Sequence, residues 1–267
     1  MTRMLLHYKI HGDTSPAART VILLHGMAAS GRYWRRLVEL QTPGIRYVSI
    51  DLLGFGQSPK PKHITYDYVT HLAAIHETLA AIGISKPVSL VGHSMGALLA
   101  LRYAAEHPTA IDKLLLVGMP YFSSANQARL DITGSNFFRK LVYYGPTSHF
   151  LCTVWCRLLR PVTRHIAPFY LRHIPHYVAQ DTLLHTWQSY AQSLQYVIEN
   201  QAVTKDLLAI TSTAVIVYGQ DEPSRGYLAE AYSTNPHEGP ISFISFPETG
   251  HQLPVTNPEI MKKLLLD

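Results

Sequence analysis

The chain has little cysteine and little charge. Its 267 residues include two cysteines, and 15% of them are charged. Cys152 and Cys156 stand four residues apart in a stretch with helical periodicity, so we expect two reduced thiols on one helix face rather than a structural disulfide. A zinc site would need further ligands at a suitable spacing, so the sequence predicts no metal site.

Long apolar runs and nucleotide-binding motifs are also missing. No stretch of 18 apolar residues offers a membrane span, and residues 1–11 lack the uninterrupted apolar run of a signal peptide. We therefore expect a cytoplasmic protein. The sequence has no glycine-rich phosphate cradle and no dinucleotide-binding fingerprint, so no cofactor is expected.

The net charge of +5 is concentrated in one segment. Residues 121–205 hold eight Lys or Arg against three acids, together with 14 of the 27 aromatic side chains. Basic and aromatic residues together can indicate a nucleic acid or an anionic membrane surface, but here they are spread along apolar helices without a dense run, so no nucleic acid is expected. A solvated outer face over an aromatic cavity lining is the plainer interpretation, and contact with a membrane surface is the alternative.

Short apolar runs alternate with helical periodicity in both halves of the chain. Strands are expected over residues 4–10, 21–24, 47–50, 88–91, 114–117, 214–218 and 241–246. Helices are expected over residues 33–40, 66–82, 95–107, 225–232 and 258–266. This alternation predicts an α/β fold with a mostly parallel central sheet and helices on both of its faces.

The alternation stops between residues 120 and 206. Helices are expected there over residues 137–144, 150–159 and 182–198, with breaks near Gly145-Pro146, Pro161, Pro168 and Pro175. No convincing strand occurs in this segment. We therefore predict a core domain made of residues 1–119 and 207–267, interrupted by an inserted helical cap, or lid, over residues 120–206.

The most informative motif is the G-x-S-x-G pentapeptide Gly92-His93-Ser94-Met95-Gly96. A short apolar run precedes it and a helix-period run follows it, so it is expected at a sharp turn between a buried strand and a helix. A serine on such a turn has a strained backbone, and the flanking glycines let strand and helix pass closely. The pattern predicts Ser94 as a nucleophile.

A serine hydroxyl needs a base to take its proton and a third group to hold that base. His251 lies on the loop after the last predicted strand, at the carboxyl edge of the sheet where ligands gather in open α/β folds. Asp221 and Glu222 follow the preceding strand, and the order serine, acid, histidine is the one this kind of sheet uses. Either carboxylate can supply the third group.

Two backbone N–H groups should face the serine, because an attacked carbonyl develops negative charge on its oxygen. Met95 begins the helix after Ser94, and Met27 follows His25-Gly26 at the end of another predicted strand. We therefore expect the backbone N–H groups of Met27 and Met95 to form an oxyanion hole.

Three further polar residues stand near these motifs. His25 and His93 are expected to stabilise their loops rather than to act on a substrate. Asp51 begins the glycine-rich loop over residues 51–58 and is expected to tether that loop by hydrogen bonds.

Taken in order, these motifs resemble those of α/β hydrolases of the esterase, lipase and meta-cleavage-product hydrolase type, which have a helical lid. The resemblance rests on His25-Gly26-Met27, the loop over residues 51–58, Gly92 to Gly96 and Gly250-His251, and it covers residues 1–119 and 207–267. It implies Ser94 as the nucleophile and His251 as the base.

The acid departs from the family pattern. The family usually places an aspartate three residues after the glycine that ends the strand; that position is Glu222 here, whereas Asp221 stands two residues after Gly219. Glutamate serves in some relatives, and Pro223 follows as it commonly does in the family. The spacing favours Glu222 and leaves Asp221 open. A serine at the turn argues against haloalkane dehalogenases and epoxide hydrolases, and the H-G-G-P-G loop of proline iminopeptidases is missing.

The sequence therefore predicts hydrolysis of a carboxylic ester or thioester, through an acyl-enzyme, on a small-molecule substrate with an apolar acyl or aromatic group. A carbon–carbon bond hydrolase of the meta-cleavage type and a non-catalytic ligand receptor are the alternatives. Aromatic residues of the predicted lid could line an apolar pocket or belong to plain core: Phe137, Phe138, Tyr143, Tyr144, Phe150, Trp155, Phe169, Tyr170 and Trp187.

Overall fold

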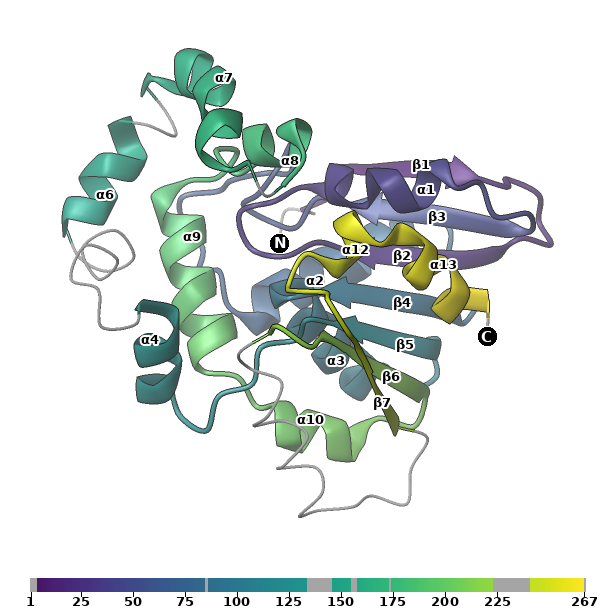
Figure 1. Cartoon of the computed structure of the whole chain (residues 1–267). Helices are drawn as coiled ribbons and strands as arrows, with labels where there is room; N and C mark the ends of the chain where they lie inside the picture. The colour runs from purple at the N-terminus through teal and green to yellow at the C-terminus, as the bar shows by residue number, and fades with distance from the viewer. Residues whose placement is uncertain are drawn as a thin grey trace.

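The computed structural model describes residues 4–84, 86–133, 146–154, 158–172, 174–222 and 241–266 (Figure 1). Its strands are β1 (Tyr8–Gly12), β2 (Arg19–Leu24), β3 (Ile45–Ile50), β4 (Val88–His93), β5 (Ile111–Val117), β6 (Thr213–Gly219) and β7 (Ile241–Phe246). All seven correspond to predicted strands, although β1 begins at Tyr8 and not at residue 4.

These strands form one sheet in the order β1-β3-β2-β4-β5-β6-β7. Only β1 runs antiparallel to its neighbour, and the other five pairs are parallel. The predicted mostly parallel sheet is therefore confirmed. Because parallel strands end at the same edge, the loops that follow β2, β4, β6 and β7 are brought together there. The pairing of Leu24 with Gly92, for example, sets the His25 loop beside the Ser94 turn.

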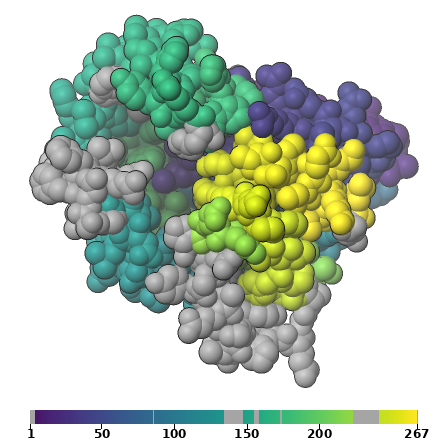
Figure 2. Space-filling model, viewed as in Figure 1, coloured from purple at the N-terminus to yellow at the C-terminus, as the bar shows by residue number. Residues whose placement is uncertain are grey.

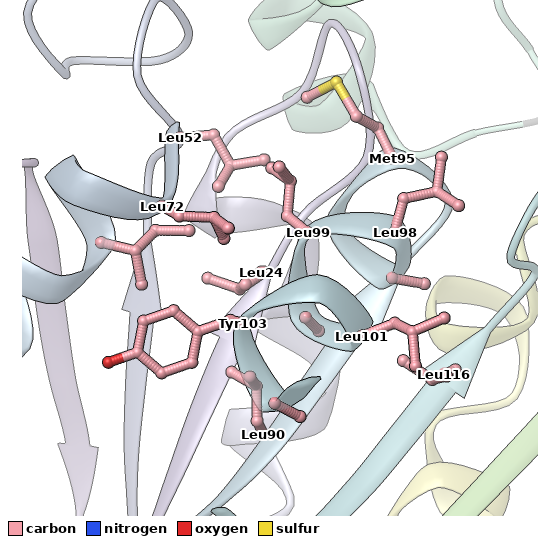
Figure 3. Packing of buried hydrophobic residues seen from close by; sticks show 14 of the residues in the cluster. Leu24, Leu52, Leu72, Leu90, Met95, Leu98, Leu99, Leu101, Tyr103 and Leu116 are labelled. Carbon is pink, nitrogen blue, oxygen red and sulfur yellow. The ribbon is translucent and has the colours of Figure 1, made fainter. Parts of the chain in front are cut away.

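Helices cover both faces of the sheet (Figure 1). On one face α2 (Tyr68–Ala81) and α3 (Met95–Glu106) belong to the larger buried apolar cluster. A second buried apolar cluster lies on the other face. It includes residues of η1 (Gly31–Trp34), α1 (Arg35–Glu39), α12 (Leu253–Thr256) and α13 (Pro258–Leu266). Figure 3 shows Leu98, Leu99 and Leu101 of α3 beside Leu24 and Leu90 of the sheet. Helix α3 packs against β4, β5, α10 and α2, and this packing holds the Ser94 turn, where α3 begins, in a rigid setting.

Between β5 and β6 the described residues form helices and no strand. They are α4 (Ala125–Thr133), α6 (Pro146–Thr153), α7 (Arg160–Tyr170), α8 (His176–Asp181), α9 (Trp187–Ser193), the π-helical η3 (Leu194–Glu199) and α10 (Val203–Ala209). We call α4 to α10 the helical segment. Its division from the rest of the chain as a separate cap over residues 120–206 stays a prediction.

One of the predicted helix breaks, the break near Pro168, is wrong, whereas the break expected near Pro161 agrees with the start of α7 at Arg160. Helix α7 contains Pro161 in its first turn and Pro168 in its interior. A proline is tolerated in the first turn because the N–H it lacks would have no partner inside the helix. Pro168 stands two residues from the end of α7, so few helical hydrogen bonds follow it. The break at Pro175 is confirmed, since Pro175 precedes the first residue of α8.

The predicted boundaries of other helices also shift. The helix expected over residues 182–198 begins only at Trp187, because Thr186 forms a capping box with Ser189: each side chain bonds to the other residue's backbone N–H. The helix expected over residues 150–159 is α6, which ends at Thr153. The helices expected over residues 137–144 and 225–232 lie outside the described residues. In the part of the chain that the structure describes, no helix has the length and apolar character needed to cross a bilayer.

Candidate active site

Ser94 occupies a strained turn between β4 and α3. Its backbone angles are φ 54° and ψ −120°, and its N–H donates to the carbonyl of Val117 at 2.9 Å. A Cβ on Gly92 would lie 2.3 Å from the carbonyl oxygen of Gly96, so only glycine fits there. Positive φ at a serine costs about 1–3 kcal/mol, which the packed surroundings of the turn must offset. The predicted strand-turn-helix setting of Ser94 is present.

The loop after β2 lies directly against this turn. A Cβ on Gly26 would lie 3.1 Å from the Cβ of Ser94. His25 is fully buried, and its Nδ1 donates to the carbonyl of Gly26 at 2.6 Å while its Nε2 accepts from the backbone N–H of Leu52 at 2.9 Å. Burial lowers the pKa of His25, which keeps the ring neutral for these two bonds. His25 therefore joins its own loop to the glycine-rich loop.

The two residues predicted to supply the oxyanion hole lie on either side of Ser94. Met95 is buried and is the first residue of α3. Met27 is half-buried and lines the same cavity as Ser94. Donation by their backbone N–H groups stays a prediction, and it agrees with the approach of the Gly26 loop to the serine.

His251 is paired with Glu222. Its Nδ1 lies 2.5 Å from Oε1 of Glu222, whose side chain is 4% exposed. The other carboxylate oxygen, Oε2, is buried and has no hydrogen-bond partner within the described part of the chain. Asp221 is exposed, and it contributes its backbone N–H to the carbonyl of Thr249 at 3.1 Å. Of the two adjacent acids, the structure thus brings Glu222 and not Asp221 to the histidine.

Gly118, at the end of β5, supports this pair and was not singled out from the sequence. It has φ +54°, and a Cβ there would lie 3.1 Å from Nδ1 of His251 and 3.2 Å from Oε1 of Glu222. Its N–H donates to the carbonyl of Val217 at 2.8 Å. A glycine directly after a fully apolar strand is the signal that could have identified it.

His93, which the sequence predicts to stabilise its loop, lies behind His251 with Tyr33 and Gln252, two residues that the sequence analysis did not single out. Nε2 of His93 donates to the carbonyl of His251 at 2.7 Å, and the His93 ring stacks on Tyr33 with centroids 4.6 Å apart. The hydroxyl of Tyr33 donates to Oε1 of Gln252 at 3.0 Å. Burial, and then the neighbouring His251, lower the pKa of His93 well below its usual value, so the ring stays neutral.

Asp51 holds the glycine-rich loop as predicted. Its Oδ1 accepts from the backbone N–H of Gly31 at 2.6 Å, and its Oδ2 accepts from that of Gln57 at 2.6 Å. The Oγ of Ser58 donates to the backbone carbonyl of Asp51. The bonds with Gln57 and Ser58 close the loop on itself, and the bond with Gly31 joins the loop to η1. Asp51 therefore has a structural role there.

Ser94 and His251 face one cavity of about 320 Å³. The helical segment and the loop before it supply most of its apolar lining: Phe122, Ile132, Ile174, Val178, Leu194 and Ile198. Figure 2 shows the surface hollowed between the helical segment and the C-terminal part of the chain. Such a space fits an acyl chain of modest length or one aromatic ring.

Of the aromatic residues predicted for this pocket or for plain core, the four that the structure describes do not line the cavity. Phe150, Phe169 and Tyr170 are exposed, so the pocket interpretation is wrong for these three. Trp187 is half-buried and stacks on Tyr190, with ring centroids 6.1 Å apart. The remaining candidates, Phe137, Phe138, Tyr143, Tyr144 and Trp155, lie outside the described residues.

Comparison with known proteins identifies relatives of this arrangement. A family model described as alpha/beta hydrolase fold matches residues 19–251. The Arabidopsis thaliana protein named "Probable lysophospholipase BODYGUARD 2" is 33% identical over 115 residues, which is 41% of this chain and 24% of that protein. Lipase 1 of Psychrobacter immobilis is 33% identical over 109 residues, which is 41% of this chain and 34% of the lipase. The chain thus spans less than half the length of these curated relatives.

A solved structure shows the same fold. The meta-cleavage product hydrolase from Pseudomonas fluorescens IP01 has a TM-score of 0.69 and 17% identity, and the match covers 98% of this chain and 93% of that one. At this identity the likeness concerns the fold alone.

Proposed function

The chain belongs to the alpha/beta hydrolase fold family, and from this premise we propose that it is a serine hydrolase that cleaves carboxylic esters or thioesters with an apolar acyl or aromatic group. The observation that carries the proposal is the shared cavity: Ser94 on its strained turn and His251 paired with Glu222 both face one apolar space. The buried Glu222 gives the histidine the fixed orientation that a general base needs.

The proposed reaction has two steps. The Oγ of Ser94 attacks the carbonyl carbon while Nε2 of His251 takes its proton, and the amides of Met27 and Met95 bind the oxygen that becomes negative. The bond to the alcohol or thiol breaks, and the leaving group takes the proton from His251. A water molecule then gives a proton to Nε2 of His251 and attacks the acyl carbon. The bond between that carbon and Oγ of Ser94 breaks, the acid is released, and His251 returns the proton to Oγ. Glu222 stabilises the charged imidazole in both steps.

The cavity and the relatives support an ester substrate. The apolar side chains of Ile132, Val178 and Ile198 offer no partner to a charged acyl group, so an apolar one is favoured. The names of the lipase and the lysophospholipase relative denote ester hydrolysis, which agrees with the proposal. We also propose that the helical segment acts as a cap, since several of its side chains line the cavity.

A series of p-nitrophenyl esters from acetate to palmitate tests this function. We expect turnover of the shorter esters and a decline once the acyl chain exceeds the cavity. Ser94→Ala should lower kcat by about a thousandfold or more. If the wild-type protein hydrolysed no member of the series, the ester proposal would be wrong.

Carbon–carbon bond hydrolysis of a vinylogous diketone is the competing activity. The Pseudomonas structure is named a meta-cleavage product hydrolase, and its likeness to this chain concerns the fold. Turnover of a dienoate substrate in preference to the ester series would favour it. A receptor with no turnover of either class, whose ligand response survives Ser94→Ala, would instead support the non-catalytic alternative.

A further inference from the structure

The outward side of helix α7 is apolar. Six large apolar side chains on it and just before it form what we call the outer face: Leu158, Leu159, Val162, Ile166, Phe169 and Tyr170. Phe169 is 67% exposed and Tyr170 is 82% exposed. With Phe150 of α6, seven of the 14 exposed large apolar side chains in the described residues lie between residues 150 and 170. Such a concentration marks an interaction surface.

An ordinary surface helix buries its apolar side, whereas helix α7 exposes it. Val162, Ile166 and Phe169 recur at intervals of four and three residues, so they share one side of the helix, and that side is exposed. The buried residues are Thr163 and Pro168. Figure 1 shows α6 and α7 at the margin of the molecule, away from the sheet. Covering this outward apolar side with another apolar surface would be favourable, because it removes apolar area from water.

The charge around the outer face favours one occupant. Between residues 132 and 180 the sequence has six of the 23 Lys and Arg residues and none of the 18 acidic ones, which leaves 17 basic against 18 acidic side chains elsewhere. Arg164 and Arg172, in and just after α7, are exposed. A second copy would oppose two basic segments, which repel each other. An anionic lipid surface attracts such a segment and accepts the apolar side chains.

We propose that the outer face docks this protein on the surface of an anionic lipid bilayer. Helix α7 lies in the plane of the interface, with Val162, Ile166 and Phe169 among the acyl chains and Arg164 and Arg172 at the headgroups. The exposed ring of Tyr170 suits this depth, because the ring is apolar and its hydroxyl can bond to water.

Docking in this way would bring the cavity close to the bilayer. Helix α7 packs against α8, and Val178 of α8 lines the cavity that Ser94 faces. Apolar molecules that leave the bilayer would therefore have a short path to the site. The docking itself does not rest on ester hydrolysis, and binding is measured without any substrate.

Vesicle sedimentation with the full chain tests the proposal. We expect binding to vesicles that contain about one-third phosphatidylglycerol, and much weaker binding to phosphatidylcholine alone. Raising NaCl to about 0.5 M should release most of the bound protein, since the attraction is screened. Phe169→Ser with Tyr170→Ser should weaken binding about tenfold or more.

The matched control is Val69→Ser on α2, since Val69 is 76% exposed and lies outside the outer face. It should bind as the wild type does, and circular dichroism of all variants checks that they fold. Binding that ignores lipid charge and salt would overturn the proposal, as would unchanged binding of the α7 double variant. A dimer that the double variant abolishes, without vesicle binding, would show that a second copy covers the outer face instead.

Discussion

His93 donates a hydrogen bond from Nε2 to the backbone carbonyl of His251 across 2.7 Å. Because His93 directly precedes Ser94, this bond joins the serine turn to the histidine loop, which lies 158 positions further along the chain. The ring is clamped by Tyr33, which in turn holds Gln252 beside His251. His93 therefore sets the relative position of the proposed nucleophile and base without touching a substrate in the proposed reaction.

Substitution of His93 tests this positioning role. His93→Leu should lower kcat about tenfold to a hundredfold with little change in KM, since a displacement of about 1 Å at the reacting groups has that effect. His93→Gln should recover much of the activity, because its side-chain amide can donate from nearly the same position. Steady-state kinetics on the best p-nitrophenyl ester measure both. If His93→Leu had the same kcat as the wild-type protein, the positioning role of His93 would be wrong.

The two adjacent acids make a sharp comparison. Glu222→Gln should lower kcat by about a thousandfold or more, because a neutral amide no longer stabilises the charged His251 or fixes its tautomer. Asp221→Asn should leave kcat within about twofold, since the Asp221 side chain is exposed and its contact with the histidine loop uses the backbone N–H. The opposite pattern would transfer the role to Asp221.

Gly118→Ala should harm both stability and activity. The positive φ alone costs about 1 kcal/mol, and the new methyl group would press on His251 and Glu222. Gly83→Ala is the matched control, because Gly83 has φ +74° with no atom within 4 Å of an added Cβ. Urea unfolding should show a loss for both variants, whereas only Gly118→Ala should lower kcat. Equal kcat in the two variants would mean that the site has room to adjust.

Buried His71 gives the protein an acid-sensitive element. Its Nε2 lies 3.0 Å from Oγ of Ser193, and burial lowers the pKa of His71 to about 4. The unfolded chain binds a proton near the ordinary pKa of 6.5, so the stabilisation from the neutral ring is complete above that pH. It is lost as the pH falls towards 4.

His71→Gln removes this dependence while leaving a side chain that can bond to Ser193. Between about pH 7.5 and about pH 4.5, the free energy of unfolding of the wild type should fall by about 2–3 kcal/mol more than that of His71→Gln. Other buried histidines, such as His25 and His93, titrate alike in both proteins and cancel in the difference. Parallel urea titrations at the two pH values measure it, and identical losses would contradict the assignment.

The sheet and the ends of its strands were predictable from the sequence. Residues 21–24 and 114–117 are fully apolar, which is typical of a parallel strand that is buried on both faces. The loops that follow such strands meet at one edge of the sheet. The sequence alone therefore places Ser94, His251 and the pair Asp221-Glu222 at one edge of the sheet. The contribution of His93 was not predictable, because its partner is a backbone carbonyl far away in the sequence.

The helical segment was harder to predict. Periodicity shows that Val162, Ile166 and Phe169 share one side of a helix, but it does not show whether that side faces a cavity or the exterior. For this reason the sequence predicts Phe169 and Tyr170 either in a pocket lining or in plain core, whereas the structure exposes them. The break expected near Pro168 is wrong because Pro168 stands two residues before the end of α7, where few helical hydrogen bonds follow it. The domain boundaries and the cytoplasmic location stay predictions.

The central claim is that Ser94 forms a covalent acyl intermediate, and labelling with an alkyl fluorophosphonate tests it most directly. We predict that intact mass spectrometry shows one adduct on the wild-type protein, that peptide mapping places it on Ser94, and that Ser94→Ala carries none. Ester hydrolysis by a wild-type protein that takes no label, or whose label maps to another residue, would contradict the account.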